Sequence, residues 1–282
     1  MMDSNFHSHC TFCDGRSHPE DFVKFAVARG FRAYGFSSHA PLPFETSWNM
    51  TKDDMPEYLA EIDRLKKKYE GKIELYVGLE IDYLDETYHA AIPFFRELPL
   101  DYRIGSLHYL PWQKPLAEAN MVCIDGPYED FRASVDTHYG GDIGRLTTDF
   151  FETSMRMVET GGFDVVGHID KVYMNGCRYP GFDRNTDRYR KPFLALLDLI
   201  AEKGLIVEVN SKNVQRKGQT YPHADTYCAL KEWNIPVMVN SDCHFPDLVN
   251  DGRNETVELL RTVGFRTLRE LVGGVWTDVP ID

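Results

Sequence analysis

Short apolar segments of strand length recur along this 282-residue chain, and most are followed by a helix-like amphipathic segment. We expect strands at residues 6–9, 32–36, 73–81, 102–108, 164–168, 205–210 and 235–241. Such an alternation favours parallel strand pairing, and an α/β barrel commonly needs about 250 residues. The pattern therefore predicts an α/β fold closed into a barrel. An open doubly wound sheet is the alternative, but no glycine-rich phosphate-binding fingerprint follows the first strand.

The segments between these strands predict the helices. We expect them at residues 17–30, 55–71, 87–97, 142–160 and 224–233, with a further helix that ends at Lys203 and a helical tail at 256–271. Residues 110–128 contain three prolines and no clear period, which predicts an inserted loop or hairpin over one face of the barrel. We find no linker and no internal repeat, so we expect residues 1–282 to form a single domain.

Histidines and carboxylates follow nearly every predicted strand. They are His7, His9, His39, Glu80, His108, His168, Glu208, Asp242 and His244, and Asp14 lies in the loop after the first strand. The carboxyl ends of barrel strands share one face, where barrel enzymes keep their active sites. Imidazole and carboxylate together suit zinc, iron or manganese. The pattern therefore predicts a polynuclear metal site at that face, with His7 and His9 pointing the same way from one strand.

A second interpretation exists for the first loop. His9 and Cys10, five further residues and then Arg16 and Ser17 match the signature of cysteine-dependent phosphatases. In those enzymes a thiolate attacks phosphorus while backbone N–H groups and the arginine hold the phosphate. This interpretation explains Cys10 and Arg16 but none of the other strand ends, and its loop should be rich in small residues. We therefore keep it as a remote alternative to the metal site.

Composition narrows the class of protein further. The net charge of −13 disfavours nucleic acid as a partner, because duplex binders usually present a basic face. The chain begins without a signal-peptide pattern and contains no apolar run of about 18 residues, so we expect no membrane association. Six scattered cysteines are typical of reduced thiols, which predicts a cytoplasmic location. The oligomeric state stays open.

The strand-end motifs resemble those of the PHP (polymerase and histidinol phosphatase) superfamily. They read HSH, then Asp14, SSH, GLE, SLH, GHID and SDCH, and they span residues 7–244. The resemblance implies a distorted (β/α)7 TIM-like barrel with a trinuclear metal site. It assigns one ion to His7, His9, Glu80 and Asp242, a second to Glu80, His108 and His168, and a third to Asp14, His39 and His244. Two departures are Asp14, where many members have histidine, and Ser38, where an acidic residue is common.

Longer matches are similar to the histidinol-phosphatase branch of this superfamily. They are SSHAPLPF, GLEIDY, SLHYL, GHIDKV, and Asn210-Ser211 followed by Arg216-Lys217 and Tyr221-Pro222. The resemblance implies hydrolysis of a small phosphate monoester, L-histidinol phosphate, to L-histidinol and phosphate, with two to three divalent ions of zinc, iron or manganese as cofactors. Another phosphoesterase or a nuclease of the same superfamily is the alternative.

Catalytic and substrate-binding residues follow from this hypothesis. Divalent ions would acidify water and offset charge at phosphorus. We expect Glu80 to bridge two ions, and Asp242 or a histidine at a strand end, such as His244, to protonate the leaving alkoxide. Arg16, Arg178 and Arg216 are candidates for contacts with the phosphate oxygens. Glu208 has no place in the ligand sets, so it is a candidate for binding a substrate amine or for supporting a ligand.

Overall fold

Parallel strands form the centre of the protein, which is described here by a computed structural model that covers residues 4–281, apart from the side chains of residues 213, 216 and 217. Their order is β1-β2-β3-β4-β7-β8-β10, and each neighbouring pair is parallel. They span Ser4–Asn5, Ala33–Phe36, Glu74–Asp82, Tyr102–Ser106, Val165–Val166, Ile206–Asn213 and Val237–Asn240. A parallel bridge between Ser8 and Cys243 joins the first strand to the last. The predicted distorted TIM-like barrel is thus confirmed.

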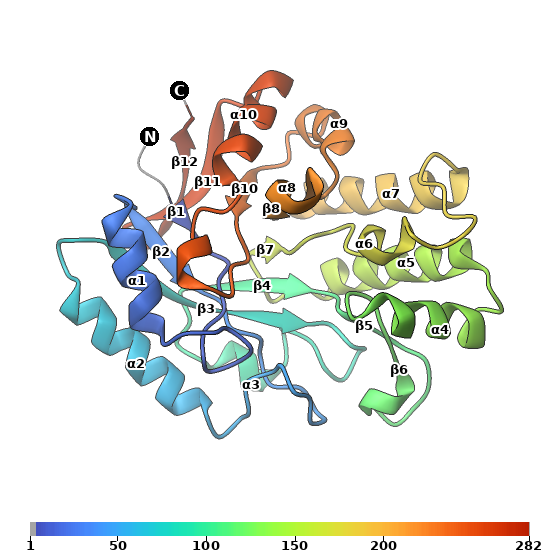
Figure 1. The fold of residues 1–282 in the computed structure, drawn as a ribbon, viewed down its shortest axis with the longest axis horizontal. Coiled ribbons are helices and arrows are strands. Elements are labelled where there is room, and N and C mark those ends of the chain that lie inside the picture. The colour runs from blue at the N-terminus through green and yellow to red at the C-terminus, as the bar shows by residue number, and fades with distance from the viewer. Residues whose placement is uncertain (1–3, 282) are drawn as a thin grey trace.

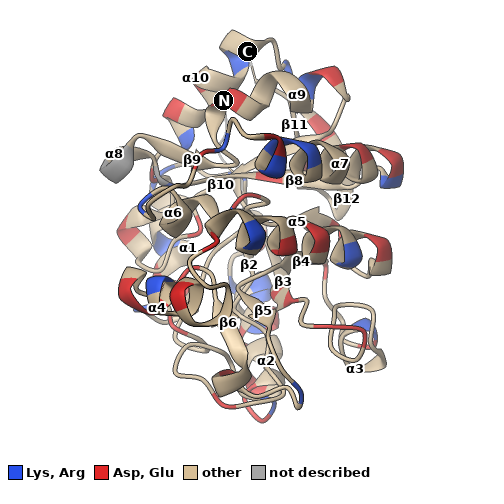
Figure 2. Cartoon of the chain, turned by 90° about the vertical axis from the view of Figure 1, so that its right-hand side faces the viewer, with Lys and Arg blue, Asp and Glu red and all other residues tan. Residues whose placement is uncertain are grey.

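Helices lie outside the strands (Figure 1). They are α1 (Pro19–Ala28), α2 (Met55–Lys68), α3 (Pro93–Arg96), α4 (Tyr128–His138), α5 (Ile143–Thr160), α6 (Tyr173–Gly176), α7 (Asp187–Lys203), α8 (Val214–Lys217), α9 (Tyr227–Glu232) and α10 (Arg253–Val263). Figure 2 shows α5 and α7 packed side by side, with their charged residues directed outward. Their buried side chains, such as Phe150 and Leu196, face the core instead, as an amphipathic helix requires.

Two apolar cores support the barrel. The larger core lies between the strands and the helices. A smaller core combines Phe6, Ala33, Tyr76, Tyr102, Ile104, Val165, Ile206 and Met238, which all come from the parallel strands or their ends, with Leu271. Leu271 belongs to an antiparallel hairpin of β11 (Thr267–Val272) and β12 (Val275–Pro280), and Trp276 of the same hairpin packs against this core. The hairpin therefore closes the end of the barrel opposite the predicted metal ligands.

Tyr102 fills the interior of the barrel at this end. Its ring is fully buried, and its hydroxyl donates to the carbonyl oxygens of Phe6 and Phe36 at 2.6 and 3.0 Å. The ring fits because the two neighbouring strands present glycine: a Cβ at Gly35 or Gly78 would lie 2.5 or 2.6 Å from an atom of the Tyr102 side chain. The three residues thus form one packing unit.

Replacing Gly78 by alanine is therefore expected to destabilise the protein by about 1–3 kcal/mol, because overpacking forces neighbouring groups out of position. Urea denaturation followed by circular dichroism measures the change. Gly71→Ala is not a suitable control, since Gly71 has a positive φ of 73°. Ser47→Ala changes a side chain outside this core and should leave the midpoint nearly unchanged. An equal midpoint for Gly78→Ala and the wild type would contradict the packing argument.

Three expected elements differ in the structure. The first strand, expected at 6–9, is β1 at Ser4–Asn5, so His7 and His9 lie after it. The predicted helical tail at 256–271 is wrong beyond Val263: Gly264, with φ 101°, ends α10, and the hairpin follows. The helix expected at 87–97 is reduced to α3. The inserted loop or hairpin predicted at 110–128 is an antiparallel hairpin of β5 (Tyr109–Pro111) and β6 (Met121–Cys123), with the 3-10 helix η1 (Glu118–Asn120) between its strands. The helix α4, which follows it, was not predicted. That residues 1–282 form one domain stays a prediction.

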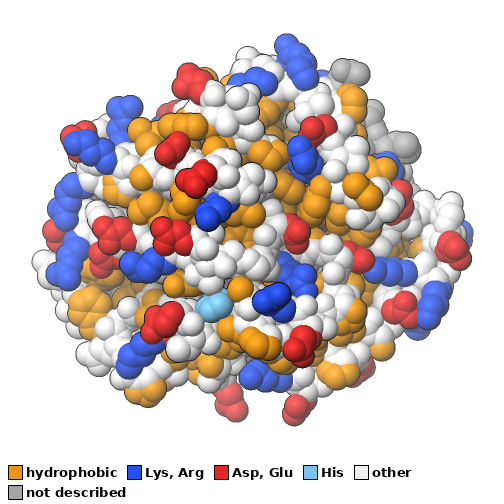
Figure 3. All heavy atoms as spheres, turned by 180° about the vertical axis from the view of Figure 1, so that it is seen from behind, with side chains coloured by type: hydrophobic (Ala, Val, Ile, Leu, Met, Phe, Trp, Pro, Cys, Tyr) orange, Lys and Arg blue, Asp and Glu red, His pale blue; other side chains and the backbone are white. Residues whose placement is uncertain are grey.

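Smaller elements and the surface complete the description. β9 (Gln219–Tyr221) pairs with β8 in antiparallel fashion, and the 3-10 helices η2 (Ala224–Thr226) and η3 (Pro246–Leu248) precede α9 and α10. Among the described residues, no helix has the length and apolar character needed to cross a bilayer. Figure 3 shows one face of the protein, on which acidic and basic side chains are interspersed.

Candidate metal centre

The carboxyl ends of the parallel strands bring all the predicted metal ligands together. His7 and His9 follow β1, His39 follows β2, Glu80 lies in β3, His108 follows β4, His168 follows β7, Asp242 and His244 follow β10, and Asp14 lies in the loop before α1. Because parallel strands end at the same face of a barrel, residues separated by more than 200 positions become neighbours. Most of these side chains are buried; Asp14 and His244 are partly exposed.

Glu80 lies at the centre of the cluster and is only 1% exposed. Its Oε2 atom lies 3.1 Å from His7 Nε2 and 3.0 Å from His39 Nδ1. Its Oε1 atom lies 2.9 Å from His168 Nε2 and 3.4 Å from His108 Nε2, and it also accepts a hydrogen bond from Ser106. The two carboxylate oxygens thus face different imidazoles, with His9 Nε2 also 3.6 Å from Oε2, which is the arrangement that a bridging ligand requires.

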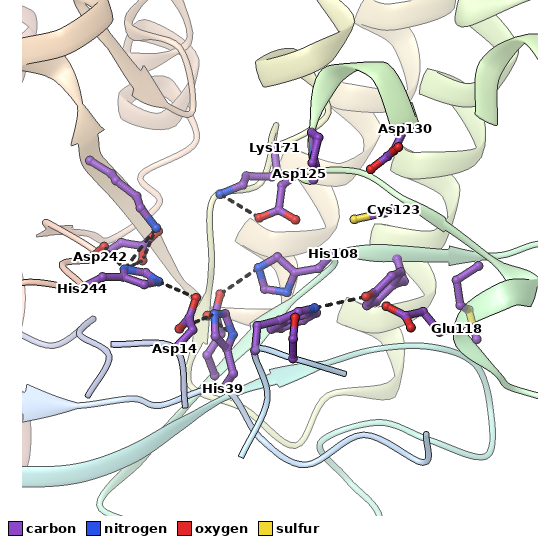
Figure 4. Close-up of a pocket in the computed structure, with 18 residues that line it drawn as sticks. Asp14, His39, His108, Glu118, Cys123, Asp125, Asp130, Lys171, Asp242 and His244 are labelled. Carbon is purple, nitrogen blue, oxygen red and sulfur yellow. Dashed lines mark hydrogen bonds and ion pairs between the residues drawn. The ribbon is translucent and has the colours of Figure 1, made fainter. Parts of the chain in front are cut away.

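Two further carboxylates complete the cluster. Asp242 Oδ1 lies 3.1 Å from His9 Nε2 and 3.9 Å from His7 Nε2, so both histidines of the first motif face it. Asp14 Oδ2 lies 3.2 Å from His244 Nε2, and Asp14 Oδ1 lies 3.8 Å from His39 Nε2. Figure 4 shows Asp14, His39, His244 and Asp242 gathered on one side of the cavity.

The donor atoms of this cluster fit divalent ions. Three groups have candidate ligand atoms within 4.8 Å of one another: His7, His9 and Asp242; His39, Glu80 and His108; and His9, Asp14, His39 and His244. Among the described residues, His7 Nε2, His9 Nε2, His39 Nδ1 and Asp14 Oδ1 are buried without a hydrogen bond. A buried polar atom without a partner is costly, and coordination to a metal ion would satisfy each of these atoms.

Burial and charge set the protonation of the cluster. Burial lowers the pKa of His9, and the neighbouring rings of His39 and His244 lower it further, which favours the neutral imidazole that binds metal. Burial opposes ionisation of Glu80, yet His7 and His108 hold the pKa of Glu80 well below its usual value. Burial also lowers the pKa of His7 and His108, but the neighbouring carboxylates outweigh it: the pKa of His7 lies well above its usual value, and that of His108 rises to about 10. Binding of an ion at these two rings would therefore displace protons.

Buried carboxylates orient two of the histidines from behind. Glu208 Oε1 lies 2.6 Å from His7 Nδ1, and Asp82 Oδ1 lies 3.0 Å from His108 Nδ1. In both cases the opposite ring nitrogen faces Glu80. This carboxylate–histidine pairing fixes the tautomer of the ring and raises its basicity as a ligand. Asp82 was not predicted from the sequence, although it follows Glu80 by two positions and therefore shares its side of β3.

Replacing Asp82 by asparagine is expected to weaken the binding of one ion by about 10- to 100-fold, because His108 loses its charged partner. Titration of the metal-free protein with zinc or manganese, followed by calorimetry, measures the affinity. Asp53→Asn, which changes an exposed carboxylate, is the matched control. Wild-type affinity at every site of the Asp82 variant would contradict this role.

A cavity of about 530 Å³ opens above the cluster. Its wall includes Asp14, His39, Glu80, His108, Asp242 and His244, together with Trp48, Tyr109, Glu118, Asp125, Asp130, Lys171 and Lys212. Sequence reasoning missed both lysines. Lys171 follows His168 by three positions, and Lys212 follows Asn210 by two. Both therefore lie just after predicted strands, where the search for histidines and carboxylates would have found them if it had also included lysines.

The predicted substrate-binding residues lie apart from this wall. Arg178 is exposed and stacks on the ring of Tyr128, with 3.9 Å between the guanidinium carbon and the ring centroid. Arg16 is exposed and lines a separate cavity of about 360 Å³, which also reaches Asp14 and His244. Arg216 lies in α8, and its side chain falls outside the described part of the chain. Glu208 is fully buried beneath His7, without a place in the wall of the main cavity.

Cys10 does not have the properties of a nucleophile. It is fully buried, it contacts Ser38 Oγ at 3.3 Å, and burial raises its pKa to about 12. A thiol with such a pKa carries almost no thiolate at neutral pH. The structure therefore gives no support to the cysteine-dependent mechanism.

Comparison with known proteins identifies the family. The model of the PHP domain family matches residues 3–212, and the chain belongs to this family. A protein of Deinococcus radiodurans named "probable histidinol-phosphatase" is 28% identical over 95% of each chain. The histidinol-phosphatase of Bacillus subtilis is 26% identical, over 86% of this chain and 94% of its own.

A solved structure shares the fold. The histidinol phosphate phosphatase of Lactococcus lactis, complexed with zinc, L-histidinol and phosphate, superimposes with a TM-score of 0.73. The match covers 97% of this chain and 98% of that protein, at 19% sequence identity. At this identity the likeness concerns the fold, and it agrees with the barrel described above.

Proposed function

We propose that this protein is a metal-dependent phosphomonoesterase that hydrolyses L-histidinol phosphate to L-histidinol and phosphate. The observation that carries the proposal is the set of histidine and carboxylate donors that meet around Glu80 at the base of an open cavity. Relatives named histidinol-phosphatase that align over most of the chain support the choice of substrate. The cavity volume suits a small phosphate ester.

The proposed ligand sets are those that the family resemblance implies. We assign two to three divalent ions of zinc, iron or manganese to the protein. One is held by His7, His9, Glu80 and Asp242, a second by Glu80, His108 and His168, and a third by Asp14, His39 and His244. Bound ions would supply charge neutralisation at the phosphate and would lower the pKa of water. Glu208 and Asp82 orient His7 and His108 for this task.

The residues of the cavity wall supply the remaining chemistry. Lys171 and Lys212 place ammonium groups beside the cluster, where they attract a phosphate dianion into an otherwise acidic protein. Lys212 Nζ also lies 3.0 Å from Asp242 Oδ1 and 3.3 Å from His244 Nδ1. The candidates for protonating the leaving alkoxide, Asp242 and His244, both line the cavity, and His244 is the more exposed of the two, with 16% of its side chain exposed against 4% for Asp242.

Phosphate release tests this function directly. L-Histidinol phosphate is compared with a panel of phosphomonoesters and a single-stranded oligonucleotide, before and after chelation and with zinc or manganese added back. We expect fast, selective release that chelation abolishes and metal restores. Chelator-sensitive activity on other esters or on the oligonucleotide would overturn the substrate while keeping the metal centre.

The variant Cys10→Ser separates the metal mechanism from the thiolate mechanism. Because Cys10 is buried and protonated, we expect this variant to retain near-wild-type kcat/KM for L-histidinol phosphate. Complete loss of activity, in a variant that keeps its circular dichroism spectrum and metal content, would instead assign catalysis to the thiol. The cytoplasmic location inferred from composition stays a prediction.

A further inference from the structure

The wall of the main cavity that faces away from Asp14 and His39 carries its own charges. Glu118, Asp125 and Asp130 come from the segment that contains the β5–β6 hairpin and the start of α4. None of these carboxylates belongs to the groups of candidate metal ligands. Figure 4 shows Glu118 and Asp130 on the far side of the cavity from His244 and Asp14, with Asp125 between the two sides.

Lys171 is the cation that meets this wall. Its side chain is 5% exposed, and its Nζ atom lies 3.4 Å from Asp125 Oδ2. The ammonium also lies 5.6 Å from the centroid of the Tyr221 ring. An ammonium group has three donors, and the ion pair with Asp125 uses one of them at a long distance. A cation so deeply buried, yet lining a cavity, therefore retains the capacity to bind an anion there.

The ion pair joins two different regions of the site. Lys171 comes three residues after His168, and His168 faces Glu80. The lysine therefore lies on the side of the cavity that carries the candidate metal ligands. Asp125 is 28% exposed and lies just after β6, on the side of the inserted hairpin. The two charges meet above His108 (Figure 4). Both residues line the cavity, so a ligand bound there can contact both charges.

We propose that the Asp125–Lys171 pair recognises a zwitterionic substrate, an alkyl phosphate that carries a protonated amine close to its ester oxygen. Lys171 contacts a phosphate oxygen, and Asp125 accepts hydrogen bonds from the ammonium group. The inference rests on the proposed function and deepens it, because it names the residues that select the substrate class. L-Histidinol phosphate, whose amine lies one carbon from the phosphorylated carbon, belongs to this class.

Charge balance explains why this pair would discriminate. Without a ligand, Lys171 and Asp125 pair with each other. A zwitterion brings an anion for Lys171 and a cation for Asp125, so both charges keep a partner when it binds. A phosphate ester without an amine would make Asp125 share Lys171 with a second anion and would bring no cation of its own to Asp125. A site whose polar groups pair with groups of the substrate rejects analogues that lack those groups. Binding such an analogue would bury a polar group of the protein without a partner, which costs free energy. Because Asp125 is partly exposed, we expect a preference of about 100-fold, smaller than for a fully enclosed group.

A pair of matched esters tests the inference in the metal-loaded enzyme. L-Histidinol phosphate is compared with 3-(imidazol-4-yl)propyl phosphate, which keeps the ring, the chain and the ester but lacks the amine. In the wild type, we expect kcat/KM to be about 100-fold higher for the aminated ester. In Asp125→Asn, we expect this ratio to fall by at least about 10-fold, chiefly through a higher KM for the aminated ester.

Two further variants separate selection from general effects. Glu129→Gln removes one negative charge from the same segment, where Glu129 pairs with Arg132 at the surface, and it should keep the wild-type ratio. Lys171→Gln should raise KM for both esters alike and should weaken competitive inhibition by inorganic phosphate. Circular dichroism and metal content establish that each variant is folded and loaded.

The outcomes are distinguishable. Equal kcat/KM for the two esters in the wild type overturns the inference without any variant, and it leaves the proposed phosphatase function standing. An equal loss on both esters in Asp125→Asn also overturns the inference. Release of phosphate from neither ester by the metal-loaded wild type overturns the proposed function, and the inference with it.

Discussion

Glu80→Gln is expected to lower kcat/KM for L-histidinol phosphate by about 10³-fold or more. The glutamine keeps the shape of the side chain, but it replaces one carboxylate oxygen with an N–H₂ group that cannot bind a cation. His7 and His39 face Oε2, while His108 and His168 face Oε1, so one of the two proposed ion sites that share Glu80 loses its ligand atom and the other keeps only a neutral amide oxygen. Steady-state phosphate release, together with elemental analysis of bound metal, measures both effects.

Glu57→Gln, an exposed change on α2, is the matched control and should behave as the wild type. The Glu80 variant should also contain fewer bound ions per chain after the same purification. If it retained full turnover, Glu80 could not be a ligand of catalytic ions, and the proposed metal centre would be wrong. Loss of activity with an unchanged metal content would instead limit the role of Glu80 to catalysis.

Chelation is expected to abolish activity and to lower the thermal stability of the protein. An ion that binds the native state alone stabilises it by about 2.7 kcal/mol at a free concentration of 100 times its Kd. The cluster provides the reason for such binding, because its buried donors lack partners without an ion. Differential scanning calorimetry with increasing zinc or manganese should show Tm rising by several degrees and activity returning in parallel.

Magnesium is the control for this experiment, since it prefers oxygen ligands and should bind weakly to a site rich in imidazole. The variant His9→Ala, which removes a ring that contacts both Glu80 and Asp242, should show a smaller rise in Tm with zinc than the wild type. A Tm independent of every divalent ion, with full activity after chelation, would contradict a metal-dependent mechanism.

The predictability of the site has a simple physical basis. Parallel strands place their carboxyl ends at one face, so a list of histidines and acids at strand ends is also a list of neighbours. His7 and Asp242 illustrate this, because they are far apart in sequence and 3.9 Å apart in space. The sequence also predicted that His7 and His9 share a side, and both rings face Glu80, although the strand expected at 6–9 is replaced by β1 at Ser4–Asn5 and the two histidines follow it.

Other features depended on tertiary packing and were missed. Gly264 ends α10, and the Gly273-Gly274 turn allows the strands that follow to pair, but the apolar spacing at 256–271 also matched a helix. The charges at the cavity wall were missed for a different reason. Asp125 and Lys171 come from loops after different strands, and nothing in their local sequence shows that they meet. Arg178, chosen from a similar loop, stacks on Tyr128 instead, while Arg16 lines a neighbouring cavity that shares Asp14, Lys212, Asp242 and His244 with the main one.

The packing of Tyr102 against Gly35 and Gly78 has a consequence for how relatives of this protein can diverge. The ring occupies space that two adjacent strands leave empty, so the three positions share one fixed volume. A lineage that acquired a larger residue at either glycine would be viable only if position 102 became smaller, and a smaller residue at 102 would release both glycines from constraint. These positions should therefore vary together across the family, independently of the metal ligands at the other end of the same strands.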